Sequence, residues 1–217
     1  MNIDKLIALH PRIYHMAERD SWPSIRQHGL LSSNEVARLS GLTGPDLRNL
    51  RSGHRAEKLT VEVPGIGAIV LRDQKPMAPD RIRRALTDGT PAARWYELIN
   101  DRVFFWVSEA RLLKLLGARE YRALEHDVLT LDTASLLAGH AENVRLCHMN
   151  SGNTFPIPHF RDLSAFTTIA AYPTTSTGRP RKPVVELTVL GSVADIQRHV
   201  IEVRRMRGST VIGQLPR

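Results

Sequence analysis

One acidic side chain, Glu186, stands in a stretch of otherwise burial-prone residues. The run Val184–Leu190 predicts a β-strand in which Val185, Leu187 and Val189 share an apolar face and Glu186 lies on the other. A carboxylate removed from water is costly unless it has partners, so this placement needs a reason. An edge strand that leaves the glutamate in water, or an ion pair with an arginine, would explain it without catalysis. A general-base or charge-stabilising role is the functional alternative.

An imidazole occupies a similar position near the start of the chain. Tyr14 and His15 lie on a short strand expected over Arg12–Met16. A lone histidine is more often a structural hydrogen-bond donor than a catalytic group, so this one gains meaning only in combination with other features.

Aromatic side chains are concentrated on a third expected strand, Val103–Val107. It contains Phe105 and Trp106 and leads into a helix expected over Glu109–Leu116, which carries Arg111 in its first turn. Aromatic strands usually belong to the core. The alternative is a surface on which a flat ring stacks.

The elements that must position these residues are short. A helix should follow the first strand, with Asp20 or Ser21 as its cap, Trp22 and Ile25 on its apolar stripe, and Gly29 as its stop. Further helices are expected from Ser33 or Asn34 to near Gly41 and over Ala78–Asp88, Pro91–Leu98, Thr133–Ala138 and Ser192–Arg198. Further strands are expected over Gly67–Leu71, Asp127–Leu131, Asn143–His148 and Val200–Arg205, and turn-rich loops over Met149–Arg161 and Thr174–Pro183.

Strands and helices are mixed without a regular strand–helix–strand alternation, which favours the α+β class. No repeat or low-complexity block interrupts the chain. We therefore expect a single domain over residues 1–217, with an insertion rich in loops and helices around residues 41–100.

Composition narrows the class of protein. Hydrophobic residues make up 42% and charged residues 24%, as in an ordinary globular protein. The formal net charge is +8, which attracts polyanions such as a nucleic acid or a dinucleotide, although many proteins are simply basic. A single cysteine, Cys147, and the absence of a signal-like or membrane-spanning apolar run predict a soluble, cytoplasmic protein.

Several familiar sites find no support. The glycines at Gly65 and Gly67 precede a strand and no helix follows, which argues against a dinucleotide-binding glycine loop. There is no phosphate-binding loop of the GxxxxGK[ST] type, no GxSxG nucleophile elbow, and no cysteine–histidine set with zinc spacing. We expect no metal.

Three segments resemble a known enzyme family in their order and separation. They are Ile13–Met16 with the following Ser24–Leu31, the aromatic strand Val103–Trp106, and Val185–Val189. Together they are similar to the DarT-type DNA ADP-ribosyltransferases and their relatives. The chain departs from that pattern after the aromatic strand, where the family has Pro-Arg-Ser-Pro-Met and this sequence reads Val107–Arg111, and near Ser21, where the family has an asparagine. The resemblance therefore indicates an outlying branch.

The resemblance implies an ADP-ribosyltransferase-like fold, with split central β-sheets flanked by short helices, and an enzyme that cleaves NAD. Glu186 would be the catalytic carboxylate, and no metal would be required. The NAD site would be formed by His15, Tyr14, Phe105, Trp106 and Arg111. The imidazole of His15 would hydrogen-bond the ribose, Phe105 or Trp106 would stack on nicotinamide, and the guanidinium of Arg111 would pair with the pyrophosphate.

The acceptor of the ADP-ribose is expected to be a nucleic acid or nucleotide. The basic loop residues Arg179, Arg181 and Lys182 precede the Glu186 strand and are candidates for contacting it. A non-catalytic, basic nucleic-acid-binding module on the same scaffold is one alternative, and a toxin that modifies a protein is another. An antitoxin or other regulatory protein is a possible partner of either toxin type.

Overall fold

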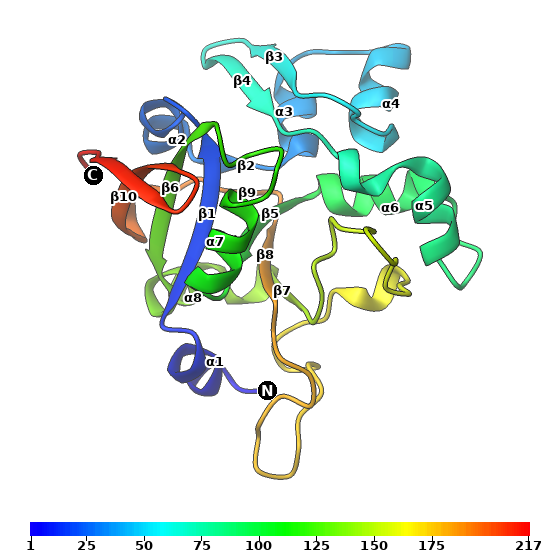
Figure 1. Ribbon diagram of the computed structural model, residues 1–217, viewed down its shortest axis with the longest axis vertical. Coiled ribbons are helices and arrows are strands. Elements are labelled where there is room, and N and C mark those ends of the chain that lie inside the picture. Colours follow the sequence, from blue (N-terminus) through cyan, green and yellow to red (C-terminus); the bar gives the residue numbers. More distant parts are fainter.

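The computed structural model describes all residues 1–217 and confirms the α+β class. Seven antiparallel strands form the main sheet in the order β11-β10-β6-β1-β5-β8-β7 (Figure 1). Their bounds are β1 Arg12–Glu18, β5 Arg102–Trp106, β6 Glu125–Asp132, β7 Val144–Cys147, β8 Glu186–Leu190, β10 Val200–Arg207 and β11 Thr210–Gln214. Two small sheets pair β2 (Leu30–Leu31) with β9 (Ser192–Val193) and β3 (Leu59–Val63) with β4 (Gly67–Leu71).

The main sheet is nearly divided between β1 and β5. Strand β1 pairs with β6 along its whole length, from Arg12 to Glu18. Its pairing with β5 consists of one position, Tyr14 opposite Trp106. The sheet thus consists of a four-stranded half and a three-stranded half that separate beyond this position.

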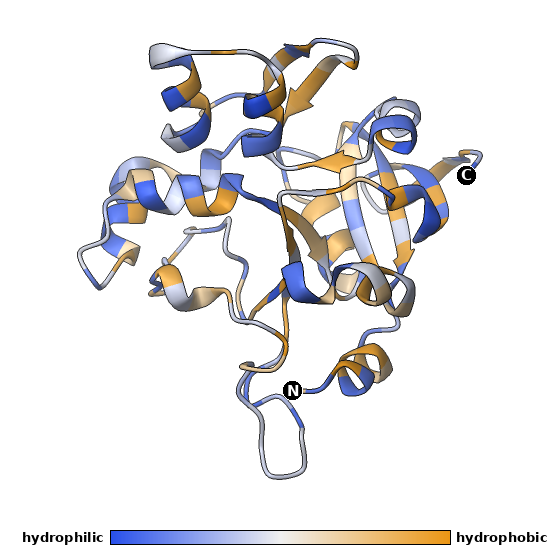
Figure 2. Cartoon of the chain, turned by 180° about the vertical axis from the view of Figure 1, so that it is seen from behind, coloured by the Kyte–Doolittle hydropathy of each residue, from blue (hydrophilic) through white to orange (hydrophobic).

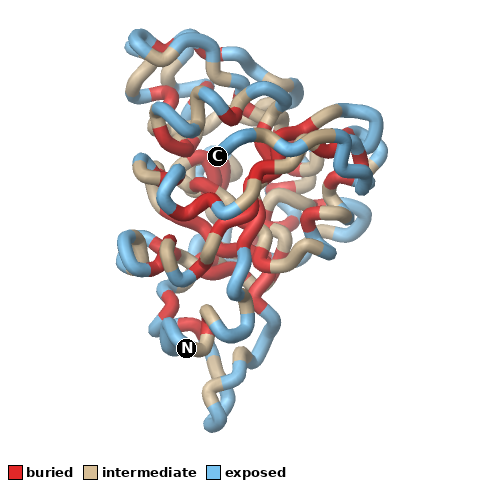
Figure 3. The backbone as a smooth tube through the Cα atoms, turned by 90° about the vertical axis from the view of Figure 1, so that its left-hand side faces the viewer, coloured by how far each residue is buried: buried red, intermediate tan, exposed pale blue.

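Eight short α-helices surround the sheet: α1 Ile3–Leu9, α2 Trp22–His28, α3 Ser33–Leu39, α4 Gly44–Ser52, α5 Pro79–Ala85, α6 Ala92–Asn100, α7 Glu109–Leu116 and α8 Thr133–His140. On one face, Leu112 and Leu116 of α7 pack on Tyr14 and Val128. The other face carries the largest core, in which α1 and α8 cover β1 and β6. The inner strands of the main sheet, such as β6 and β8, form the buried centre of the molecule (Figure 3), and apolar residues alternate with polar ones along the sheet (Figure 2).

Helices α3 and α4 and the β3–β4 hairpin lie together at one end of the molecule (Figure 1). They have a small core of their own, made by Val36, Ala37, Leu50, Val61, Val63 and Leu71. Except for α3, which precedes it, this group lies in the segment where we expected an insertion around residues 41–100.

Most of the expected elements form close to their predicted bounds, and two expectations need correction. The cap of α3 is Ser32, whose hydroxyl accepts from the Glu35 amide at 3.1 Å, rather than Ser33 or Asn34. The helix expected over Ser192–Arg198 is instead the strand β9 followed by one 3₁₀ turn, Ile196–Arg198. Helix α1, the strands β2 and β3, and the last strand, β11, were not predicted.

None of the helices is both long enough and apolar enough to cross a lipid bilayer.

Candidate active site

A large cavity opens where the two halves of the main sheet separate. Its volume is about 1210 Å³, somewhat above the usual range of small-molecule sites, so a dinucleotide-sized ligand fits. Residues of β1, β5 and β8 line it together with the Met149–Arg161 loop and the end of β4. Basic side chains outnumber acidic ones in its wall, which suits an anionic ligand.

Glu186 is the buried acid of this cavity. It is the first residue of β8, only 4% exposed, and β8 lies between β5 and β7, with Trp106 on one side and Cys147 on the other. The interpretation of this segment as an edge strand with its glutamate in water is therefore wrong. The Ser151 amide donates to both carboxylate oxygens at 3.2 Å, which fixes the direction of the carboxylate.

The environment of Glu186 shifts its pKa toward neutrality. Burial raises the pKa of Glu186 to about 7, although hydrogen bonding from Ser151 and the charges of Arg161 and Arg111 act in the opposite direction. Neither arginine forms an ion pair with the carboxylate. Glu186 thus combines a cavity position with a pKa near neutrality, as expected of an acid–base or charge-stabilising group.

His15 bridges the gap between the two half-sheets. Its Nδ1 lies 2.8 Å from the Phe104 carbonyl oxygen of β5, and a carbonyl can only accept, so Nδ1 carries the hydrogen. Burial lowers the pKa of His15 to about 4 against the raising effect of this hydrogen bond, with the charge of Arg72 lowering it further. The ring is therefore neutral near pH 7, with Nε2 as a hydrogen-bond acceptor.

The sheet register sets the separation of His15 and Glu186. Trp106 lies opposite Tyr14 on one side and opposite Glu186 on the other. Neighbouring strands are about 4.8 Å apart, so the backbones of Tyr14 and Glu186 are about 10 Å apart, and His15 is the next residue. Both residues line the same cavity.

Arg161 was not singled out from the sequence, yet it organises the loop that holds Glu186. Its buried guanidinium donates to the carbonyls of Ser151 at 2.6 Å, Asn153 at 2.8 Å and His159 at 2.9 Å. The Ser151 amide in turn donates to Glu186. In the sequence, Arg161 is one of 30 lysines and arginines and carries no distinguishing pattern.

Arg72 is a second residue that the sequence did not reveal. It lines the cavity directly after β4, where its guanidinium lies 4.7 Å from the centre of the Tyr121 ring and donates to the Met16 sulfur at 3.3 Å. It forms no ion pair, and burial lowers its pKa. A half-buried guanidinium without an anionic partner is well placed to receive one from a ligand.

The whole site falls within a single family model. A model described as "Family of unknown function (DUF7002)" matches residues 11–200, which contain both His15 and Glu186. The chain belongs to the DUF7002 family. No curated protein matches it.

The aromatic residues of this DUF7002 protein divide between the cavity and the core. Trp106 is half-buried and lines the cavity. Phe105 also borders the cavity, but it is 1% exposed and belongs to the main core, with its ring edge-on to His15. Tyr14 does not line the cavity, because it points to the face covered by α7. Of the three, only Trp106 offers a ring to a ligand.

Only some of the basic residues named from the sequence line the cavity. Arg111, exposed on α7, and Lys182 line the cavity of the DUF7002 protein. Arg179 and Arg181 do not. They lie on the exposed Thr174–Pro183 loop, which projects away from the sheet (Figure 1), and Arg181 donates to the carbonyl of Thr174 within that loop at 3.0 Å.

Proposed function

We propose that this DUF7002 protein is an NAD-dependent ADP-ribosyltransferase. The observation that carries the proposal is Glu186, a buried carboxylate with a pKa near 7 that is aimed by the Ser151 amide and shares a dinucleotide-sized cavity with the neutral His15. The resemblance of the segments around these residues to DarT-type enzymes supports the same reading. The departures after Trp106 and near Ser21 favour an outlying branch.

The chemistry needs one fixed negative charge. As the bond between nicotinamide nitrogen and ribose carbon breaks, its electron pair passes to the pyridinium and nicotinamide leaves as a neutral molecule. Positive charge develops on the ribose, as in glycoside hydrolysis. Ionised Glu186 stabilises that charge, and accepts the proton lost by the acceptor when its nucleophilic atom bonds to the ribose carbon.

The remaining cavity residues bind the cofactor in this proposal. His15 accepts a hydrogen bond from a ribose hydroxyl through Nε2, because Nδ1 is occupied by Phe104. Trp106 stacks on the nicotinamide ring. Arg72 and Arg111 pair with the pyrophosphate; Arg72 takes the larger share, because it is already enclosed and lacks an anionic partner.

The rim of the cavity favours a nucleic acid or nucleotide as the acceptor. Phe155, Ile157 and Phe160 are large apolar side chains that are strongly exposed on the same loop that holds Glu186, and Phe160 lines the cavity. Exposed aromatic rings beside basic side chains are typical of surfaces on which bases stack. Lys182 supplies a positive charge at the same rim.

The decisive experiment measures release of nicotinamide from NAD and transfer of labelled ADP-ribose to single-stranded DNA, RNA or protein. Glu186→Gln should lower the rate at least about 100-fold, as losing a group that stabilises the transition state does. Glu142→Gln, at an exposed glutamate outside the cavity, is the matched control and should keep the full rate. Equal rates in the two variants would overturn the proposal.

A non-catalytic nucleic-acid-binding module remains the second candidate, favoured by the net charge of +8. It predicts salt-sensitive binding of oligonucleotides with neither NAD consumption nor a rise of the thermal midpoint on addition of NAD. Specific NAD binding must raise that midpoint with concentration.

A further inference from the structure

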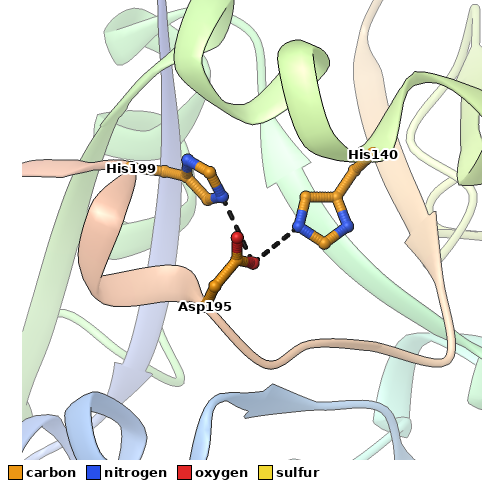
Figure 4. A group of neighbouring side chains, drawn as sticks. All are labelled: His140, Asp195 and His199. Carbon is orange, nitrogen blue, oxygen red and sulfur yellow. Dashed lines mark hydrogen bonds and ion pairs between the residues drawn. The ribbon is translucent and has the colours of Figure 1, made fainter.

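Three side chains from two parts of the chain meet outside the candidate active site. His140 is the last residue of α8, Asp195 precedes the 3₁₀ turn Ile196–Arg198, and His199 follows that turn immediately before β10 (Figure 4). Their ligand atoms all lie within 4.8 Å of one another. None of the three lines the cavity.

Two imidazole nitrogens converge on one carboxylate oxygen. Nε2 of His140 lies 2.7 Å from Oδ1 of Asp195, and Nε2 of His199 lies 3.3 Å from the same atom. A tetrahedral zinc ion with bonds of 2.0–2.1 Å holds its ligand atoms about 3.3 Å apart. The His199–Asp195 separation already has this value, and the His140–Asp195 separation needs to lengthen by only about 0.6 Å.

The second nitrogen of His199 is fixed in the way that metal-binding histidines require. Its Nδ1 lies 2.8 Å from the Ser135 hydroxyl, and that hydroxyl is directed at the Arg198 carbonyl at 3.4 Å. When the hydroxyl donates to that carbonyl, Nδ1 is the donor and Nε2 has the free lone pair that a metal needs. Metal ligands almost always have their other ring nitrogen held by an outer partner of this kind.

Nε2 of His199 has no hydrogen-bond partner. His199 is 4% exposed, and its Nε2 makes no hydrogen bond of acceptable geometry although Asp195 lies beside it. A buried nitrogen lone pair that faces a carboxylate oxygen is unfavourable unless a cation lies between them. A proton or a metal ion would serve, and the third ligand from His140 favours the metal.

We propose that His140, Asp195 and His199 bind a zinc ion, with water as the fourth ligand. Two imidazoles and one carboxylate are a donor set that zinc takes readily. The zinc would tie the end of α8 to the connection between β9 and β10. The cysteine–histidine spacings tested in the sequence do not include this set. It contains no cysteine, and His140 and Asp195 are 55 positions apart.

The test uses full-length protein stripped with a chelator and dialysed. Elemental analysis after addition of zinc should give one ion per chain, and the thermal midpoint should rise with zinc concentration. Asp195→Asn and His140→Ala should each lose both effects, whereas Asp46→Asn and His159→Ala, at exposed positions outside the cluster, should keep them.

Cobalt provides a readout on unmodified protein that does not depend on how the variants fold. Cobalt(II) in a four-coordinate site of this kind should give visible absorption bands that zinc abolishes by competition. Stoichiometric zinc without these bands, the same zinc response in Asp195→Asn, or no binding at all would overturn the proposal, and the last outcome would leave a proton as the bridging cation.

Discussion

Because Glu186 is buried, its ionised form destabilises the folded protein near neutral pH. Its pKa in the folded protein, about 7, is higher than the ordinary value of 4.5, so folding favours its protonated form. The contribution to stability is therefore complete below about pH 4.5 and is lost as the pH rises through 7. The cost in the ionised form is about 3 kcal/mol, from 1.36 kcal/mol per pKa unit.

We therefore expect Glu186→Gln to become more stable than the natural protein as the pH rises from 5 to 8. Glutamine keeps an oxygen to accept from the Ser151 amide and never ionises. Thermal midpoints measured across this range should diverge in favour of the variant. Parallel curves would mean that the carboxylate is solvated and that the proposed site is open to water.

The same groups predict the pH dependence of catalysis. Because the proposed mechanism needs ionised Glu186, kcat/KM for NAD should rise with pH and level off above a midpoint near 7. His15, with a pKa of about 4, is neutral over the whole of this range and should add no second inflection between pH 5 and 8. A bell-shaped profile within those limits would assign the acid–base role to another group.

Residue types allowed part of this site to be predicted. Glu186 and His15 are ionisable side chains on apolar strands, which marks them even in a single sequence. Arg72 and Arg161 carry no such mark, because their roles depend on contacts made only in the folded chain: Arg72 with the Tyr121 ring, and Arg161 with three carbonyls of its own loop. Phe105 and Trp106 are adjacent aromatics that both line the cavity, and the face of β5 that each occupies decides that Phe105 is buried in the main core while Trp106 is half-buried.

At the scale of elements, the turn after α2 places the strictest demand on one residue. Gly29 has a φ of 85°, and a methyl group there would lie 2.6 Å from the Cα of Ala194 and 2.9 Å from the Val193 carbonyl oxygen. Both obstacles are backbone and cannot rotate away. The close approach lets the following strand, β2, pair with β9.

Gly29→Ala should therefore lower the free energy of unfolding by more than about 2 kcal/mol, from the left-handed backbone together with the clash. Gly139→Ala is the matched control, because Gly139 lies within α8 with open space around it and should gain about 0.5–1 kcal/mol. Urea titrations of the two variants measure both changes. A neutral Gly29→Ala would show that the β2–β9 contact is not needed for stability.

The loop between β7 and β8 should depend on Arg161 in a way that charge alone cannot replace. Lysine keeps the positive charge but cannot reach the carbonyls of Ser151, Asn153 and His159 together, because it lacks the planar fork. Arg161→Lys should increase protease cleavage within residues 153–160. It should also lower kcat about tenfold through a misplaced Ser151 amide, an effect comparable to a 1.4 kcal/mol loss. Wild-type cleavage and turnover in this variant would remove Arg161 from the site.

Local pattern predicted the central strands and most of the helices, because apolar periodicity and caps are properties of neighbouring residues. Helix α7, from Glu109 to Leu116, is an example. The helix predicted from Ser192 does not form, because a tertiary contact determines the structure of this segment. Val193 pairs with Leu30, so the chain is a strand there. The last strand, β11, has only β10 as a neighbour and little burial, so its sequence carries a weak signal.

At the scale of the whole molecule, the decisive feature is the parting of β1 from β5, and no stretch of sequence encodes it. It arises because β1 follows β6 from Arg12 to Glu18 while β5 turns to follow β8. The long-range register brings His15 and Glu186, 171 positions apart in the chain, to one opening. The fold class could therefore be predicted from the sequence, and His15 and Glu186 could be singled out there. The cavity that they line could be found only in the structure.

The net charge of +8 acts on any polyanion, so a specific acceptor surface must be separated from this general attraction. The exposed Arg179 and Arg181 lie in the loop that leads to Lys182 at the cavity rim. If the acceptor is a single-stranded nucleic acid that crosses this loop, changing both arginines to alanine removes two phosphate contacts. The slope of log affinity against log salt should then become shallower by about 1.4, from about 0.7 per phosphate.

The control for that measurement is Arg119→Ala with Arg122→Ala, because these two exposed arginines lie outside the cavity and their loss changes the net charge by the same amount. Oligonucleotide binding measured by fluorescence anisotropy over a salt series should show the shallower slope and about tenfold weaker affinity only in the first double variant. Equal changes in the two double variants would mean that net charge alone attracts the nucleic acid. In that case the acceptor reaches Glu186 past the exposed aromatic loop without passing over Arg179.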